Sequence, residues 1–159
     1  MLCLIILCVF GLAVGSFDYS GRATMLDLKA FFSTNEKIFL YMRSYSRHVG
    51  GSDPRCIANE KTFLNETSLR VAQSYTYARG TKYYFVDYAL SEATLPDEAP
   101  LMEATGPGGK KRIYRFQFYD EEGKCAVITF SDNVCSIKCE LHVWKVNAKN
   151  KPSENCDRE

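Results

Sequence analysis

Residues 125–144 read CAVITFSDNVCSIKCELHVW, and this stretch decides the fold of the 159-residue chain. Cys125 opens its first apolar run, Glu140 lies in its second, and Cys156 follows soon afterwards. Two cysteines that bracket a short acidic and aromatic strand suggest a β-barrel pinned by a disulfide, with a carboxylate directed at its interior. Such an arrangement is suited to holding a small ligand rather than transforming one.

The N-terminus is typical of a secretory signal peptide. Residues 2–14 are almost wholly apolar, and Ala13-Val14-Gly15 supplies the small residues that a signal peptidase recognises. The apolar run is shorter than the roughly 20 residues of a transmembrane helix. We therefore expect a signal peptide at residues 1–15 and a secreted, extracellular mature chain at residues 16–159 that forms one domain.

Export determines the expected cysteine chemistry, because disulfides persist in an oxidising compartment. Of the seven cysteines, Cys3 and Cys8 leave with the signal peptide. The disulfide candidates that remain are Cys56, Cys125, Cys135, Cys139 and Cys156. Five is odd, so one thiol is unpaired or bridges to another chain, and the pairing stays open. Apart from such a bridge, we expect a monomer.

Two further motifs concern modification and metal binding. Asn65-Glu66-Thr67 is a glycosylation sequon, so we expect a glycan on Asn65 of the exported chain. Cys135, Cys139 and His142 lie close together in the sequence, which is an alternative zinc-binding arrangement. They lack a fourth ligand and the usual paired spacing, and we therefore expect no metal and no cofactor.

Composition argues against several function classes. The 20 basic and 19 acidic residues nearly balance, and no basic stripe or cationic amphipathic helix indicates nucleic acid or a membrane as partner. With two histidines, no Ser-His-Asp or Cys-His arrangement can be recognised from spacing. The glycine-rich segment at residues 106–110 lacks the spacing of a phosphate loop. We expect that the protein is not an enzyme.

Periodicity predicts one short helix followed by eight strands. Thr24 and Asp27 resemble a capping box, and the helix that follows has one apolar stripe and ends near Ser33. The strands are expected at residues 37–45, 55–63, 69–77, 82–90, 101–105, 112–119, 125–130 and 139–146. Because no helical patterns alternate with them, we predict an all-β, eight-stranded antiparallel up-and-down barrel, with a β-sandwich as the alternative.

Several segments also carry a family resemblance. Residues 36–41 follow the predicted helix, and Arg55-Cys56, Tyr83-Tyr84 and residues 139–141 lie further along the chain. These segments resemble the tick salivary lipocalins of the histamine-binding protein family, over most of the mature chain. The resemblance implies a lipocalin barrel at residues 16–159. The chain ends three residues after Cys156, so we expect a shorter C-terminal closure than in relatives.

The sharpest element of the resemblance is the family's amine-binding signature. It runs Cys-Asp-(Val/Ile/Leu), a spacer, Glu-Leu-(Trp/Tyr), a second spacer and Cys. Both spacers fit here, with twelve residues after Val127 and thirteen residues before Cys156. Two positions differ, since Ala126 stands in place of the aspartate and His142 in place of the aromatic residue.

The resemblance implies that Glu140 faces the barrel interior as the counter-ion of a protonated amine. Because side chains alternate along a strand, His142 and Trp144 then line the cavity beside it. A buried cation needs a nearby carboxylate, and aromatic faces add cation–π attraction of about 0.5–2 kcal/mol. The absence of an aspartate at Ala126 and a positive charge on protonated His142 both weaken the expected affinity for an amine.

The remaining candidates for ligand binding are aromatic or acidic residues on the predicted strands. They are Phe39, Tyr41, Asp87, Tyr114, Phe116 and Phe118. Asp87 is a second candidate counter-ion and Glu103 a weaker one, although either can equally be a surface carboxylate. The three aromatic residues from 114 to 118 share one face by alternation, and core packing explains them as well as ligand stacking does.

Three functional hypotheses follow. The first is a secreted salivary scavenger that binds histamine or serotonin and so suppresses the inflammatory and haemostatic defences of the host. The second is a binder of an eicosanoid or fatty acid, whose carboxylate would need donors such as Arg43, Arg115 or Tyr114. The third is a barrel whose outer surface inhibits a protein of complement or haemostasis. Charge inside the barrel separates the first two, and a filled interior favours the third.

Overall fold

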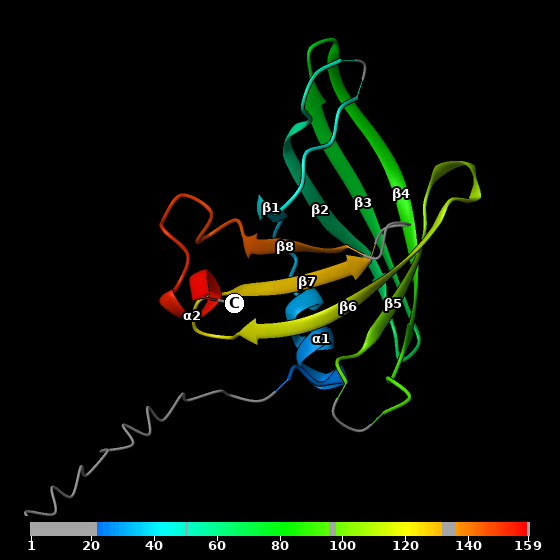
Figure 1. Ribbon diagram of the computed structural model, residues 1–159, viewed down its shortest axis with the longest axis vertical. Helices are drawn as coiled ribbons and strands as arrows, with labels where there is room; N and C mark the ends of the chain where they lie inside the picture. Colours follow the sequence, from blue (N-terminus) through cyan, green and yellow to red (C-terminus); the bar gives the residue numbers. More distant parts are fainter. Residues whose placement is uncertain (1–21, 50, 96–97, 132–135, 159) are drawn as a thin grey trace, which may run out of the picture.

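The computed structural model describes residues 22–49, 51–95, 98–131 and 136–158. Eight antiparallel strands form a closed barrel in chain order, in which the first strand pairs with the last (Figure 1). The strands are β1 (Ile38–Arg43), β2 (Arg55–Leu64), β3 (Ser68–Tyr77), β4 (Gly80–Ser91), β5 (Leu101–Thr105), β6 (Lys111–Asp120), β7 (Cys125–Ser131) and β8 (Ile137–Trp144). The predicted up-and-down barrel is confirmed, and the sandwich alternative is wrong.

Two predictions concern residues that the structure does not describe. The signal peptide at residues 1–15 and the disulfide candidate Cys135 both lie outside the described ranges. Within those ranges, we find no helix with the length and apolar character needed to cross a membrane.

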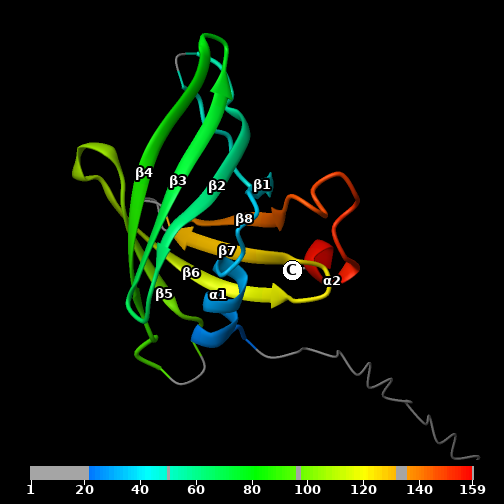
Figure 2. The same cartoon turned by 180° about the vertical axis from the view of Figure 1, so that it is seen from behind.

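A short helix, α1 (Met25–Phe32), fills the end of the barrel away from the long β3–β4 hairpin (Figure 2). The predicted capping box forms, with the Thr24 backbone N–H donating to Asp27 and the Asp27 N–H donating to the Thr24 hydroxyl. These bonds satisfy amide groups that a helix start leaves without partners. Phe31 is fully buried and lies 5.7 Å from the Phe116 ring, so the helix closes the core from below.

A bulge in β6 changes which face of the barrel wall the following side chains point to. The register with β7 shifts between Phe116 and Phe118, so the strict alternation of side chains breaks there. Phe116 packs in the interior core, whereas Phe118 joins a second cluster with Val127 and Leu141. The Gln117 carbonyl at the bulge accepts a hydrogen bond of 3.1 Å from the Ala23 N–H, which ties the start of α1 to the barrel.

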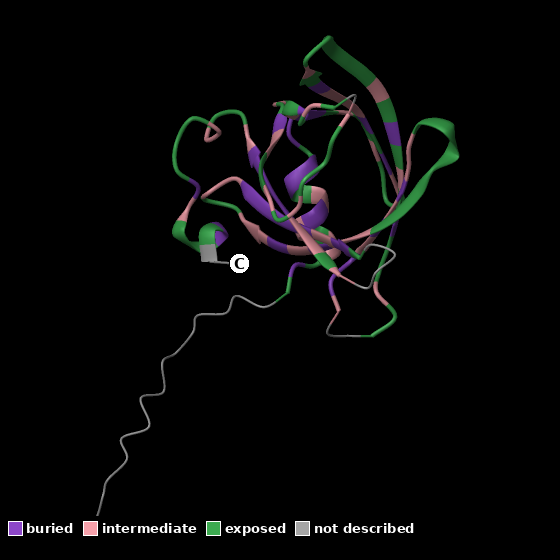
Figure 3. Ribbon diagram, turned by 45° about the horizontal axis from the view of Figure 1, so that its top comes forward, coloured by how far each residue is buried: buried purple, intermediate pink, exposed green. Residues whose placement is uncertain are grey.

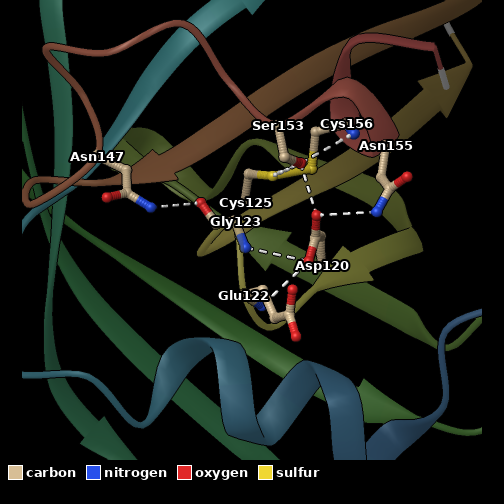
Figure 4. Close-up of a disulfide and its surroundings, with 8 residues drawn as sticks. All are labelled: Asp120, Glu122, Gly123, Cys125, Asn147, Ser153, Asn155 and Cys156. Carbon is tan, nitrogen blue, oxygen red and sulfur yellow. Dashed lines mark hydrogen bonds between the residues drawn. A yellow bond between two sulfur atoms is a disulfide. The ribbon is translucent and has the colours of Figure 1, made fainter.

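The second cluster lies under the C-terminal segment. A short helix that the sequence analysis did not predict, α2 (Glu154–Arg158), carries Cys156, and a disulfide joins it to Cys125 on β7. Beside this bond, Asp120 accepts hydrogen bonds from Ser153 at 2.6 Å and from Asn155 at 3.3 Å (Figure 4). The C-terminal segment is thus fastened to the barrel by one covalent bond and a polar network.

Burial differs between the two ends of the barrel. In Figure 3 the buried segments gather around α1, whereas the tip of the β3–β4 hairpin is exposed. The barrel therefore has one end filled by side chains and one end open to solvent.

The disulfide closes a loop with a sequence separation of 31 residues. We expect the double variant C125S/C156S to lose about 3–4 kcal/mol of unfolding free energy, because the cross-link no longer restricts the unfolded chain. Urea denaturation of oxidised samples measures this change. The matched control is Cys56→Ser at an exposed, free cysteine, and an equal loss in both variants would contradict the expectation.

Candidate functional site

The candidate site is a cavity inside the barrel, beside two polar residues of β8. Glu140 is 7% exposed and His142 is 6% exposed, so both are buried. They lie two residues apart on one strand and therefore face the same side, which here is the barrel interior. A buried acidic residue is uncommon unless it has a partner, and this one calls for a specific explanation.

Both oxygens of the Glu140 carboxylate already have hydrogen-bond partners. The Tyr45 hydroxyl donates to Oε1, and His142 Nε2 lies 3.0 Å from Oε2. Because an ionised carboxylate only accepts hydrogen bonds, Nε2 carries the proton in this contact. The three side chains form one connected polar unit at the bottom of the cavity.

This unit keeps Glu140 ionised despite its burial. Burial raises the pKa of Glu140, but the hydrogen bond and charge of His142 and the hydroxyl of Tyr45 lower it more, with a further contribution from Arg112. The net result is a pKa below the ordinary value of the group. Burial, together with the adjacent Glu140 charge, raises the pKa of Tyr45, so its hydroxyl remains a donor.

The walls of the cavity combine apolar and polar side chains. The apolar residues include Phe32 from α1, Val71 and Met102. Polar side chains come from Asn59 and Gln73, whose amide groups hydrogen-bond to each other at 2.8 Å. The cavity therefore offers a carboxylate, a guanidinium, amides and aromatic faces beside its apolar side chains.

The cavity is small as it stands. Its volume of about 40 Å³ accommodates a few water molecules at about 10–15 Å³ each, far below the roughly 300–1,000 Å³ of typical ligand clefts. Tyr45 and Arg47 line both this cavity and a wide mouth above it of about 1,180 Å³. A ligand that displaces these two side chains would join the two spaces.

Tyr45 belongs to the connection between β1 and β2, part of which lines the barrel mouth. Its ring packs edge-on against Phe130 at 5.3 Å. Asp53 holds the same connection through ion pairs with Arg43 at 3.9 Å and His48 at 3.8 Å. At these distances both pairs are loose, and the connection is also tied to β8, because the Ser44 N–H donates to the Cys139 carbonyl at 3.0 Å.

Some predicted site residues lie at the cavity, and others support it from below. Glu140, His142 and Tyr114 line the cavity. Phe116 is fully buried beneath it against α1. Trp144 also lies at the filled end, where its Nε1 donates to the Phe31 carbonyl at 3.1 Å, so its placement corrects the expectation that it lines the cavity.

Four other predicted site residues lie away from the cavity. Phe39 pairs with Val143 of the outer cluster, and directly opposite residues share a face of the sheet. Tyr41 is 40% exposed at a bulge of β1, and Phe118 is on the outer side of the β6 bulge. Asp87 is exposed and pairs with Arg70 at 2.6 Å. The expectation that these residues contact a ligand inside the barrel is wrong.

Sequence analysis missed several residues that do line the cavity, namely Tyr45, Arg47, Asn59, Gln73 and Tyr88. Gln73 carries a usable signal, because it is a polar residue that alternates with Leu69, Val71 and Tyr75 on one face of β3, and Asn59 lies opposite it on β2. Tyr45 carries none, since it follows the end of β1 and alternation no longer determines its direction.

The structure also describes the two free cysteines, two of the three candidate zinc ligands and the sequon. Cys139 and His142 are three residues apart on β8 and so face opposite sides of the sheet, which separates two of the proposed zinc ligands. Cys56 and Cys139 are free, and the glycosylation sequon is exposed at the β2–β3 turn. The Asn65 side-chain oxygen accepts from the Thr67 and Ser68 N–H groups, while the glycan itself stays a prediction.

Comparison with known proteins identifies a family. The family model described as tick histamine binding protein matches residues 22–159 of the chain. This range contains the whole barrel together with α1 and α2. No curated protein matches the chain significantly.

The lowered pKa of Glu140 links stability to pH. Its ionised form stabilises the fold above the ordinary pKa of 4.5, and this contribution disappears as the pH falls through the lowered value. Glu140→Gln should therefore be less stable than the native protein at pH 7, with a gap that narrows below pH 4.5. Urea denaturation at several pH values measures the gap. A gap that stays constant with pH would contradict the assignment, and the exposed Glu92→Gln is the control.

Proposed function

The chain belongs to the tick histamine-binding protein family, and from this premise we propose that it sequesters a biogenic amine, histamine or serotonin. Membership supports the binding of a small mediator of this kind. We further propose that the protein is secreted into saliva and lowers the free concentration of the amine, which would suppress inflammatory and haemostatic defences of the host.

The observation that carries the amine proposal is the buried charge of Glu140. It is the one carboxylate among the described residues that line the cavity. A protonated amine in an apolar enclosure needs such a counter-ion, and the low pKa of Glu140 keeps that counter-ion charged at neutral pH. Tyr88 and Tyr114 line the same space and offer ring faces for cation–π contact.

Binding would require an exchange of partners at the carboxylate. Tyr45 and His142 occupy its two oxygens, so an ammonium group gains access when one of them moves away. Tyr45 is the better suited of the two, because its side chain lines both the cavity and the mouth. Ala126 is fully buried in the interior core and contributes no second charge, which favours one amine per barrel.

We propose binding without chemical conversion. The described residues that line the cavity include no serine, threonine, cysteine or lysine that His142 and Glu140 could activate as a nucleophile. The polar unit therefore supports ligand recognition rather than covalent catalysis.

A fatty acid or eicosanoid is the second candidate ligand, since Arg47 and Tyr114 both line the cavity and can donate to a carboxylate. The other two donors that the sequence suggested are engaged elsewhere. Arg43 lies near Asp53, and Arg115 pairs with Glu98 at 3.1 Å. The small volume beside Glu140 also counts against a long hydrocarbon chain.

Calorimetric titration with histamine, serotonin and a leukotriene tests the proposal. We expect one-to-one amine binding that weakens at least tenfold, or about 1.4 kcal/mol, in Glu140→Gln, because the cation loses its counter-ion. The exposed Glu92→Gln should bind like the native protein. Leukotriene binding that is indifferent to Glu140→Gln, without amine binding, would favour the second candidate instead.

His142 provides an independent test, because it competes with the amine for Glu140. Replacing it by phenylalanine frees one carboxylate oxygen for the ammonium group. We expect His142→Phe to bind histamine several-fold more tightly than the native protein in calorimetric titration at pH 7. Weaker binding would contradict this expectation and indicate that His142 helps to hold the ligand.

A further inference from the structure

The mouth of the barrel is a separate concave surface above the Glu140 cavity. Its volume is about 1,180 Å³, and its walls come from the β3–β4 hairpin, the β5–β6 hairpin and the β1–β2 connection. In Figure 1 the tips of both hairpins lie at the end of the barrel away from α1. The mouth is large enough for a ligand of drug size, which the inner cavity is not.

Basic side chains line the mouth, whereas the Glu140 carboxylate lies in the cavity below. Six of its lining residues are basic, namely Arg47, Lys82, Lys110, Lys111, Arg112 and Lys138, and the described lining residues include no aspartate or glutamate. Lys111 is paired, since it lies 2.6 Å from Glu103. For Arg47, Lys110 and Arg112, no carboxylate of the described residues lies within ion-pair distance of 4.0 Å. These three cations are available to an anionic ligand.

Aromatic rings fix the position of Arg112, one of these three cations. The Arg112 guanidinium lies 4.2 Å from the centre of the Phe130 ring, within the range of a cation–π contact. Phe130 in turn packs edge-on against Tyr114 at 5.2 Å. A guanidinium with a fixed position loses little entropy on binding and presents paired donors that suit phosphate oxygens.

The apolar surface of the mouth is aromatic rather than aliphatic. Tyr75 and Tyr84 stand edge to face at 6.0 Å on adjacent strands, and Tyr88 lies 6.3 Å from Tyr114. Small or aliphatic side chains in the lining are few, with Val86 the largest. Such walls suit a flat aromatic ring, and they offer little contact to a hydrocarbon tail.

We propose that the mouth binds a nucleoside di- or triphosphate. Its base would stack on the tyrosines of the β3–β4 hairpin, and its phosphates would contact Arg47, Lys110 and Arg112. Stacking of a base on an aromatic side chain contributes about 1–3 kcal/mol and tolerates any base, so no particular nucleobase is specified. The site does not include Glu140, although it shares Arg47, Tyr88 and Tyr114 with the cavity below.

Titration of the oxidised protein with ADP tests this site. Adenosine and pyrophosphate, which each supply half of the ligand, should bind at least tenfold more weakly than ADP. The double variant K110Q/R112Q should weaken ADP binding at least tenfold. The matched control Lys149→Gln removes an exposed lysine in the segment between β8 and α2 and should stay within twofold of the native protein.

Three results would overturn the proposal. One is the absence of ADP binding to a protein that circular dichroism shows to be folded. Another is ADP binding that K110Q/R112Q leaves unchanged. The third is pyrophosphate or arachidonate binding as tightly as ADP at these residues, which would make the mouth a general anion surface or a lipid site. Histamine titration of the same samples is scored separately, so loss of ADP binding alone leaves the amine proposal intact.

Discussion

The burial of one ionised carboxylate is the constraint on which the interior of this barrel depends. An isolated charge in an apolar core is strongly disfavoured, so Glu140 is compatible with the fold only when partners surround it. Tyr45 and His142 supply these partners from two different places, the β1–β2 connection and β8 itself. Because β1 and β8 are the strands that close the barrel, the polar unit forms only in the closed structure.

The bulges in β1 and β6 explain how certain side chains of these strands reach the outer surface of the barrel. In β1 the register shifts after Leu40, and in β6 it shifts after Phe116. Each shift moves the following side chains to the other face of the sheet. Phe118 thereby joins the outer cluster under Cys156, and the disulfide fastens the C-terminal segment over that cluster. On the inner face of these strands, side chains of α1 pack into the interior core.

The open half of the barrel contains two spaces, a cavity and a mouth above it, which are lined by different polar groups. A single carboxylate lies at the bottom, next to amides and tyrosines, in a space smaller than typical ligands. Above it, a wide mouth has basic side chains and aromatic walls. Tyr45 and Arg47 line both spaces, so movement of the β1–β2 connection would alter them together. A cation that enters the barrel must first pass a positively charged rim, which slows its association through electrostatic repulsion.

The sequence alone determined the local elements, because capping, alternation and turn residues act over a few positions. The helix that begins after Thr24 and all eight strands are in place, and the inward direction of Glu140 agrees with the family signature. Tertiary structure decided which face of each strand points inward, since bulges and barrel closure set it. Alternation therefore could not exclude Phe39 or Phe118 from the cavity, and it could not bring Tyr45 to Glu140 across 95 residues of chain.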